Sequence, residues 1–235
     1  MRKKDMKRWN LAQQYEYNWW KNYSGDLEWY REFSHEIESY TCPYLTIKED
    51  TTILEIGSGA AGALTFLNSK NKYAIDPLED YYRGRKEFSQ FRDKRVHYTS
   101  GRGEELPYQD SFFDLIIIDN VLDHCEKPLL VLDEMNRVLK PCGIIFFRQN
   151  IYTRWGWMIR KFMELFSIDK GHPHTFIMHY LQTFFKEQSW EVQIQEGTSY
   201  MHSWKNDMFS GSVKGLIKAC LFVTRSRTLF ILKKK

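Results

Sequence analysis

Three glycines near residue 57 have the spacing of a loop that holds a nucleotide-like ligand. Gly57, Gly59 and Gly62 form a G-x-G-x-x-G pattern at the end of the β-branched, apolar segment 51–57. Glycine adopts backbone torsions that are closed to other residues and lets the chain approach a ligand closely. The amides at the start of a following helix then face that ligand. A purely structural tight turn would show the same glycines, so other residues must support the assignment.

Two carboxylates flank this loop and indicate which ligand it holds. Asp76 ends the next predicted strand, 17 residues after Gly59, where a carboxylate can accept hydrogen bonds from both hydroxyls of a ribose. NAD and S-adenosylmethionine (SAM) share that ribose, so Asp76 does not separate them. Glu55 can attract the α-ammonium of a methionine group, directly or through water, but it would repel a pyrophosphate. The pair therefore favours SAM.

The residues around these groups alternate between strand and helix signals. Apolar or β-branched runs predict strands at 51–57, 72–76, 96–100, 114–119, 144–147, 190–195 and 228–232. Helical spacing predicts helices that open at 63–67 and cover 129–139 and 180–188, with Pro141 and Gly143 ending the second. This alternation predicts an α/β fold with a parallel sheet. Such sheets bind ligands at the carboxyl ends of their strands, here the loops after 56, 76, 100 and 119.

With these residues in place, the chain resembles the class I SAM-dependent methyltransferases, in particular the type 11 methyltransferase-domain group. The resemblance rests on ILEIGSG, GRGEELPYQDSFFDLIIIDNVLDHCEKP and LLVLDEMNRVLKPCGIIFF, in this order across about 50–150, and on HPHTF at 172–176. It implies a Rossmann-like, seven-stranded, mostly parallel sheet flanked by helices, with the last strand antiparallel. It also implies SAM as cofactor and S-adenosylhomocysteine as product.

The resemblance also assigns site residues. Those implied to bind the cofactor are Glu55, Gly57, Ser58, Gly59, Asp76, Pro77, Arg102, Gly103, Glu104, Asp119 and Asn120. Among them, Arg102 stands where many members carry an acid for the adenine amino group, so the adenine would rely on backbone groups or stack on the guanidinium. Cys142 replaces the first glycine of the usual Pro-Gly-Gly turn.

Three histidines are candidates for the acceptor side. His124 occupies the family's common histidine position after the fourth strand and is the first candidate for a general base, although a structural role is also open. His172 and His174, together with Trp20, are expected near the acceptor. No metal site is expected, because two histidines are too few ligands and the four cysteines form no C-x-x-C pair.

The segments outside the resemblance are expected to form the acceptor pocket. Residues 1–45 are aromatic-rich and are predicted to form a helical cap or lid, and 46–235 the methyltransferase domain with insertions at about 150–175 and 197–225. The basic, aromatic helix predicted within 150–166 could lie on a membrane. We expect it to pack on the sheet or cover the pocket instead.

Composition excludes several partners. The 235 residues carry a net charge of +4, concentrated in the two tails rather than in a stripe across the fold, which disfavours nucleic acid. No apolar run spans a bilayer and no signal sequence is recognisable, so a cytoplasmic location is expected. The predicted function is methyl transfer to a small-molecule acceptor, with O-methylation of a sugar, natural product or lipid precursor expected. A non-catalytic SAM-binding module and an NAD-dependent dehydrogenase are the alternatives, and the oligomeric state is open.

Overall fold

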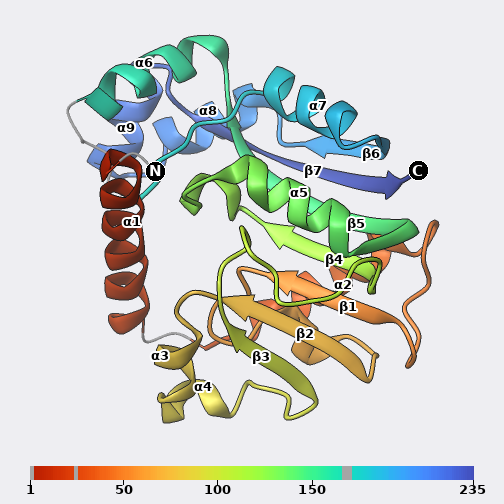
Figure 1. The fold of residues 1–235 in the computed structure, drawn as a ribbon. Helices are drawn as coiled ribbons and strands as arrows, with labels where there is room; N and C mark the ends of the chain where they lie inside the picture. The colour runs from red at the N-terminus through yellow and green to blue at the C-terminus, as the bar shows by residue number, and fades with distance from the viewer. Residues whose placement is uncertain (1–2, 24–25, 166–170) are drawn as a thin grey trace.

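One seven-stranded sheet organises the chain, as the computed structural model shows for residues 3–23, 26–165 and 171–235 (Figure 1). The strand order is β3-β2-β1-β4-β5-β7-β6. The strands are β1 (Thr52–Ile56), β2 (Asn71–Asp76), β3 (Val96–Ser100), β4 (Phe113–Asp119), β5 (Leu139–Tyr152), β6 (Trp190–Gly197) and β7 (Arg225–Lys234). Strands β1 to β5 pair in parallel, and β7 pairs antiparallel with both of its neighbours. The predicted α/β sheet with an antiparallel last strand is confirmed.

Helices cover both faces of the sheet. They are α1 (Lys3–Lys21), α2 (Trp29–Thr41), η1 (Ala63–Phe66), α3 (Glu79–Arg83), α4 (Lys86–Ser89), η2 (Leu122–His124), α5 (Pro128–Val138), α6 (Arg154–Leu165), α7 (Met178–Glu187), α8 (Tyr200–Met208) and α9 (Val213–Cys220). None of these described helices is long and apolar enough to cross a membrane.

The apolar run of β4 explains the two cores. Successive side chains of a strand point to opposite faces, so Ile116 and Ile118 enter one buried cluster and Leu115 and Ile117 enter the other. Helices α5 and α7 close the first cluster, whereas α2 closes the second. The central strand is therefore buried on both sides, as the unbroken apolar sequence predicts.

Two elements differ from the sequence prediction. The helix predicted to open at Ala63 is only a four-residue 3₁₀ turn, because β2 begins at Asn71 and leaves too little chain for a longer helix. Helix α2 packs against this turn. The strand predicted at 144–147 extends over Leu139–Tyr152 because β7 pairs with it along its second half.

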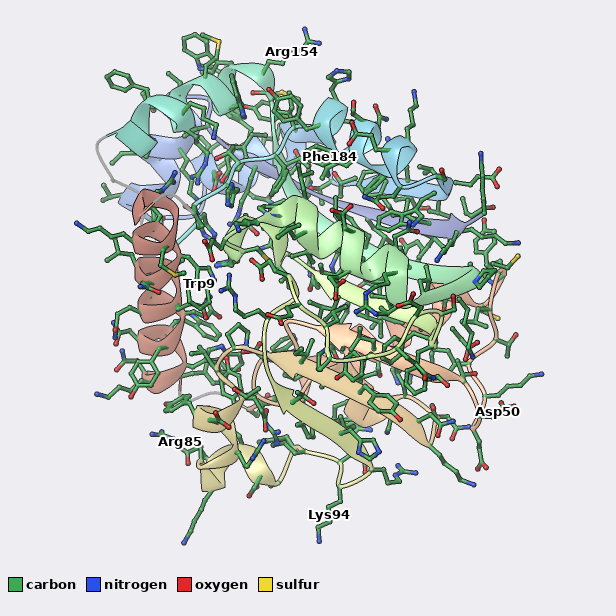
Figure 2. The ribbon with its side chains drawn as sticks, viewed as in Figure 1. Trp9, Asp50, Arg85, Lys94, Arg154 and Phe184 are labelled. Carbon is green, nitrogen blue, oxygen red and sulfur yellow. The ribbon has the colours of Figure 1, made fainter. Side chains whose placement is uncertain are left out.

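The carboxyl ends of the parallel strands meet at one edge of the sheet, and α1 runs along that edge (Figure 1). Figure 2 shows Trp9 on the side of α1 that faces the strand ends. Helices α6 and α9 lie side by side at the upper end of the same edge (Figure 1). Segments from both ends of the chain therefore surround the loops where the sequence predicts ligand binding. The division into a 1–45 cap and a 46–235 domain stays a prediction.

Candidate active site

The glycine loop is held in shape by the carboxylate that precedes it. Gly57, Gly59 and Gly62 all have positive φ, at 72°, 59° and 77°, which L side chains rarely adopt. A Cβ on Gly62 would lie 2.5 Å from an oxygen of Glu55. The missing side chain gives Glu55 room to accept hydrogen bonds from the amides of Ala63 and Leu64, both at 3.2 Å. The third glycine of the motif therefore serves this carboxylate.

Glu55 is buried, with 4% of its surface exposed, and lines the central cavity. Burial raises its pKa to about 8 against the lowering effect of the two amides, and the nearby Asp119 and Asp76 carboxylates raise it further. A cation bound in the cavity would relieve this cost. The structure thus gives Glu55 a backbone-positioning role, and its contact with an ammonium group stays a prediction.

Asp76 lies at the end of β2 and is also buried. One carboxylate oxygen accepts from the amide of Gly59 at 3.0 Å, and the other accepts from the amide of Leu78 at 2.8 Å. A carboxylate offers about four acceptor positions, so two remain for hydroxyl donors. Burial raises the pKa of Asp76 to about 6, and the Glu16 and Glu79 charges add to this.

Asp119, at the end of β4, is neutralised by arginines. Arg148 binds it in a bidentate pair with distances of 2.8 and 2.7 Å, and Arg227 approaches to 3.3 Å. Arg148 also donates to Glu36 of α2. The next residue, Asn120, has a positive φ of 55°, and its side-chain oxygen accepts the backbone amide of Asn150 at 3.1 Å. Both residues line the cavity. Their side chains form hydrogen bonds with Arg148 and Asn150 in the last part of β5.

Two histidines and an aspartate meet beyond β4. His124 and His172 have ring centroids 4.6 Å apart in an edge-to-face arrangement. The carboxylate of Asp123 lies 3.1 Å from Nδ1 of His172 and 4.0 Å from Nε2 of His124. Although burial alone would raise the pKa of Asp123, the two imidazoles and the amide of Gln149 hold it at about 2. A charged, buried carboxylate therefore lies beside both imidazoles.

The third histidine has a different environment. His174 does not line the cavity. Its ring lies 3.3 Å from the carbonyl of Glu126, and its amide donates to the carbonyl of Asp123. Burial lowers the pKa of this imidazole. His174 therefore fastens the chain after residue 170 to the η2 turn, and it is His172 that faces the cavity.

The ligand atoms of Asp123, His124 and His172 all lie within 4.8 Å of one another, close enough to hold a metal ion. Asp123 already accepts from Gln149 at 2.9 Å, and three ligands would leave the metal coordination open. The sequence did not predict this grouping, because it weighed His172 with His174 rather than with the η2 turn.

One cavity of about 550 Å³ joins these groups. Of the residues assigned by sequence to the cofactor, it is lined by Glu55, Gly57, Ser58, Gly59, Asp76, Pro77, Gly103, Glu104, Asp119 and Asn120. His124, His172 and Trp20 line it too. Trp20 packs against Gly59, where a Cβ would lie 2.9 Å from its ring, so it belongs to the glycine-loop side. Arg102 and His174 are outside the lining.

Arg102 has a structural partner instead. It pairs with Glu126 at 2.7 Å and stacks over the ring of Trp9 at 4.3 Å. The carboxylate of Glu104 also has structural partners, because it accepts hydrogen bonds from the backbone amides of Glu126 and Lys127. The wall next to β3 is therefore formed largely by the backbone of Gly101 and Gly103, in line with an adenine that relies on backbone groups.

Sequence reasoning expected segments 1–45, 150–175 and 197–225 around the pocket but did not assign most of their side chains to its walls. Helices α1 and α2 add Trp9, Gln13, Tyr15, Glu16, Trp19, Trp29, Tyr30 and Phe33. The far side adds Tyr152, Arg160, Lys214, Lys218, Val223 and Arg225. The crowding of aromatics in the first 35 residues is the signal for the former. For the latter, the signal is the pair Lys214 and Lys218, which are one helical turn apart.

The donor set fits SAM. Asp76 keeps two acceptor positions for the ribose hydroxyls, and the buried carboxylates of Glu55 and Asp76 favour a cofactor that carries an ammonium and a sulfonium. The cavity volume lies within the roughly 300–1,000 Å³ typical of small-molecule sites. These residues would hold the cofactor along the ends of β1, β2 and β4.

Comparisons with known proteins agree with this geometry. Residues 54–147 match the family described as "Methyltransferase domain". A malonyl-[acyl-carrier protein] O-methyltransferase of Marinomonas sp. (strain MWYL1) is 28% identical over 154 residues, or 63% of this chain and 55% of that protein. A demethylmenaquinone methyltransferase of Bacillus mycoides (strain KBAB4) is 29% identical over 107 residues, or 40% of this chain and 45% of that protein. The matches thus span about half the length of these relatives.

Solved structures show the same fold. The geranyl diphosphate C-methyltransferase of Streptomyces coelicolor A3(2), solved with S-adenosyl-L-homocysteine, has a TM-score of 0.65 at 10% identity and covers 91% of this chain and 86% of that one. The MccD protein has a TM-score of 0.62 at 16% identity, with 85% of this chain and 96% of that one covered.

Proposed function

The chain belongs to the class I SAM-dependent methyltransferases, and from this premise we propose that it transfers a methyl group from SAM to a small-molecule acceptor. The observation that carries the proposal is a single cavity shared by the glycine loop, Asp76 and the imidazoles of His124 and His172. One end has the donor set of the cofactor, and the other has groups that can accept a proton. Malonyl-[acyl-carrier protein] and demethylmenaquinone, named for two relatives, also support an organic acceptor.

The protein's own work in this reaction is alignment and exclusion of water. The cofactor supplies an electrophilic methyl group on a sulfonium and leaves as S-adenosylhomocysteine. Asp76 holds the ribose, and the loop from Gly57 to Gly62 supports the methionine part. The aromatic side chains of α1 and α2 cover the glycine loop and keep water away from it. Holding the acceptor in line with the methyl group then contributes most of the rate.

An oxygen acceptor is the form of the reaction that the histidine cluster supports best. A hydroxyl must lose its proton as the new bond forms, and His124 and His172 are the imidazoles that line the cavity among the described residues. The buried carboxylate of Asp123 stabilises the imidazolium that results. We therefore propose O-methylation with His124 as base and His172 as the second candidate.

A methyl-transfer assay tests this function. The purified protein is titrated with S-adenosylhomocysteine by calorimetry and then incubated with methyl-labelled SAM and a fractionated small-molecule extract. Label should enter an organic product with the wild type and not with Asp76→Ala. Cofactor binding without any labelled product would favour the non-catalytic module, and absence of cofactor binding would contradict the proposal as a whole.

A further inference from the structure

The two ends of the cavity carry opposite charges. Its acidic lining residues are Glu16, Glu55, Asp76, Glu104 and Asp119, which come from α1 and from the ends of β1 to β4. Its basic lining residues are Arg160, Lys214, Lys218 and Arg225, which come from α6, α9 and β7. The acidic end suits a cationic cofactor. The basic end needs another explanation, because the cofactor's positive charge gains nothing from it.

The basic side chains converge from three separate elements. Lys214 and Lys218 are four residues apart on α9 and so share one face of that helix. Arg225 begins β7. Arg160 of α6 is buried, donates to the hydroxyl of Thr175 at 3.0 Å and stacks over Tyr152 at 4.8 Å. A solvent-exposed charged face of a single helix would not bring together cationic side chains from three separate elements.

Among the described residues that line the cavity at this end, the side chains are cationic and none is acidic. Burial lowers the pKa of Lys218, and Arg225, Lys214 and Arg160 lower it further against the opposing effect of Asp207. Asp207 lies 3.8 Å from Lys218 and also accepts from Thr224. Among the described residues, neither Lys214 nor Arg225 forms an ion pair. Like charges gathered at the wall of a cavity attract an anion to it.

Apolar surface adjoins this basic end. Tyr152 and Val223 line the cavity beside the cations. Outside it, the indole of Trp155 donates to the carbonyl of Leu221 at 3.0 Å, which joins α6 to the end of α9. The large apolar side chains exposed on these elements are Trp155, Met158, Phe162, Val213, Leu216, Ile217, Leu221 and Phe222. Exposed apolar side chains gathered on neighbouring helices are typical of a binding region.

We propose that Lys214, Lys218 and Arg225, with Arg160 behind them, form the acceptor subsite for an anionic amphiphile, whose carboxylate or phosphate they bind while its hydrocarbon part lies along the apolar surface of α6 and α9. This inference rests on the proposed function, because it names the class of acceptor for the same cavity. The amphiphile is either a free molecule or a lipid presented in a membrane.

The probe is dodecyl phosphate below its micelle concentration, with dodecyltrimethylammonium as the amphiphile of equal chain length and opposite charge. Calorimetry is done on protein saturated with S-adenosylhomocysteine. Dodecyl phosphate should bind at least about tenfold more tightly than the cation. Lys214→Gln/Lys218→Gln should lose at least about tenfold in that affinity, since each removed cation takes away a charge-assisted contact.

The matched control is Lys186→Gln/Lys205→Gln, which removes the same charge from exposed positions outside the cavity and should bind dodecyl phosphate as the wild type does. Equal affinity for both amphiphiles, or equal losses in both double variants, would overturn the subsite. The S-adenosylhomocysteine affinity of each variant should stay within about threefold of wild type. Wild-type protein that fails to bind S-adenosylhomocysteine would contradict the proposed function, whatever the amphiphile result.

Sedimentation with vesicles separates the two sources of the anion. Phosphatidylcholine vesicles are compared with vesicles that contain phosphatidylglycerol. A lipid acceptor predicts that wild type sediments with the anionic vesicles and that Lys214→Gln/Lys218→Gln does not. A free acceptor predicts that dodecyl phosphate binds and neither vesicle does. Equal sedimentation of both proteins with both vesicles, without charge-selective binding of dodecyl phosphate, would contradict the proposal.

Discussion

Nδ1 of His172 lies 3.1 Å from Oδ2 of Asp123, although 49 residues separate them in the chain. This contact does not have the geometry of a hydrogen bond. The other oxygen of Asp123 accepts from Gln149 at 2.9 Å, so the carboxylate is fixed against β5. His124 packs edge-to-face on the His172 ring. One buried charge therefore supports two imidazoles at the cavity wall, and either could act as the base.

The first prediction tests whether His124 or His172 is the general base. General-base assistance is typically worth about 10²–10⁴-fold, and glutamine keeps hydrogen-bonding capacity without titrating near neutral pH. His124→Gln should lower kcat at least tenfold and leave the affinity for S-adenosylhomocysteine within about threefold of wild type, with His179→Gln on the exposed face of α7 as control. If His172→Gln shows that split instead, His172 is the base. If neither lowers kcat, the acceptor needs no base.

The second prediction concerns the pH dependence of cofactor binding. In the free protein burial raises the pKa of Glu55 to about 8 and that of Asp76 to about 6. A bound ammonium and ribose hydroxyls stabilise the ionised carboxylates and so lower both values. Binding therefore releases protons, and S-adenosylhomocysteine should bind more tightly as pH rises from 5 to 7.5. Calorimetry in buffers of different ionisation enthalpy counts the protons, and proton uptake would contradict the argument.

The third prediction concerns how the burial of Asp76 changes the free energy of unfolding with pH. Because the folded-state pKa of Asp76 lies above its ordinary value of 3.8, the folded protein is stabilised at low pH and loses that stabilisation as pH rises from about 4 to about 6. The cost is at most about 3 kcal/mol at neutral pH. The free energy of unfolding of Asp76→Asn relative to wild type should thus increase between pH 4.5 and 7.5, as measured by urea unfolding without ligand.

The exposed Asp80→Asn, which removes a carboxylate from the protein surface, is the control for that measurement. Asp76→Asn should also weaken S-adenosylhomocysteine binding roughly 10- to 150-fold, because a hydrogen bond to a charged acceptor is worth about 1.5–3 kcal/mol. A variant that binds the cofactor normally would remove Asp76 from the ribose site.

The fold was predictable because its signals are local. The run 114–119 is apolar without interruption, and α5 repeats its buried side chains at helical spacing, so neither needed information from distant parts of the chain. Gly59 and Asp76 were predictable for a related reason, because the topology of a parallel sheet brings its strand ends together. Their hydrogen bond at 3.0 Å shows that closeness.

Much of the detail of the site was not predictable, since it depends on contacts between distant segments. Arg102 was assigned to the adenine, but Glu126 and Trp9 hold it instead. His172 and His174 looked equivalent in sequence. In the structure His172 lines the cavity and His174 does not. No local pattern determines which of two neighbouring side chains meets Asp123.

The fourth prediction concerns the irregular part of β5, where its register with β4 shifts between Leu139 and Ile144. Cys142 has φ of 60° and is exposed, and a side chain in this left-handed region costs about 1–2 kcal/mol. Cys142→Gly should therefore raise the free energy of unfolding by about 1 kcal/mol, once the greater freedom of glycine in the unfolded chain is subtracted. Cys42→Gly, at a position with φ of −48°, should not stabilise the protein. Destabilisation by Cys142→Gly would mean that its side chain packs favourably.

The last prediction tests the N-terminal lid and depends on where its aromatics lie. The sequence predicts that residues 1–45 form a helical cap or lid. In the structure, however, Tyr30, Phe33 and Ile37 of α2 are buried in the core against the sheet. Removal up to Tyr40 should therefore yield insoluble protein. Helix α1 instead places several residues on the cavity wall and few in the core, so the lid is better tested by α1 alone.

A chain starting at Asp26 keeps α2 and removes α1. It should stay folded by circular dichroism but bind S-adenosylhomocysteine at least about tenfold more weakly, because Trp9, Glu16 and Trp20 leave the cavity wall and water reaches the glycine loop. Trp20→Ala within the full chain is the smaller test. This substitution removes the indole that packs over Gly59. It should also weaken S-adenosylhomocysteine binding, although α1 stays in place. Normal cofactor affinity in the shortened chain would make α1 a cover for the acceptor or a surface helix rather than a lid over the cofactor.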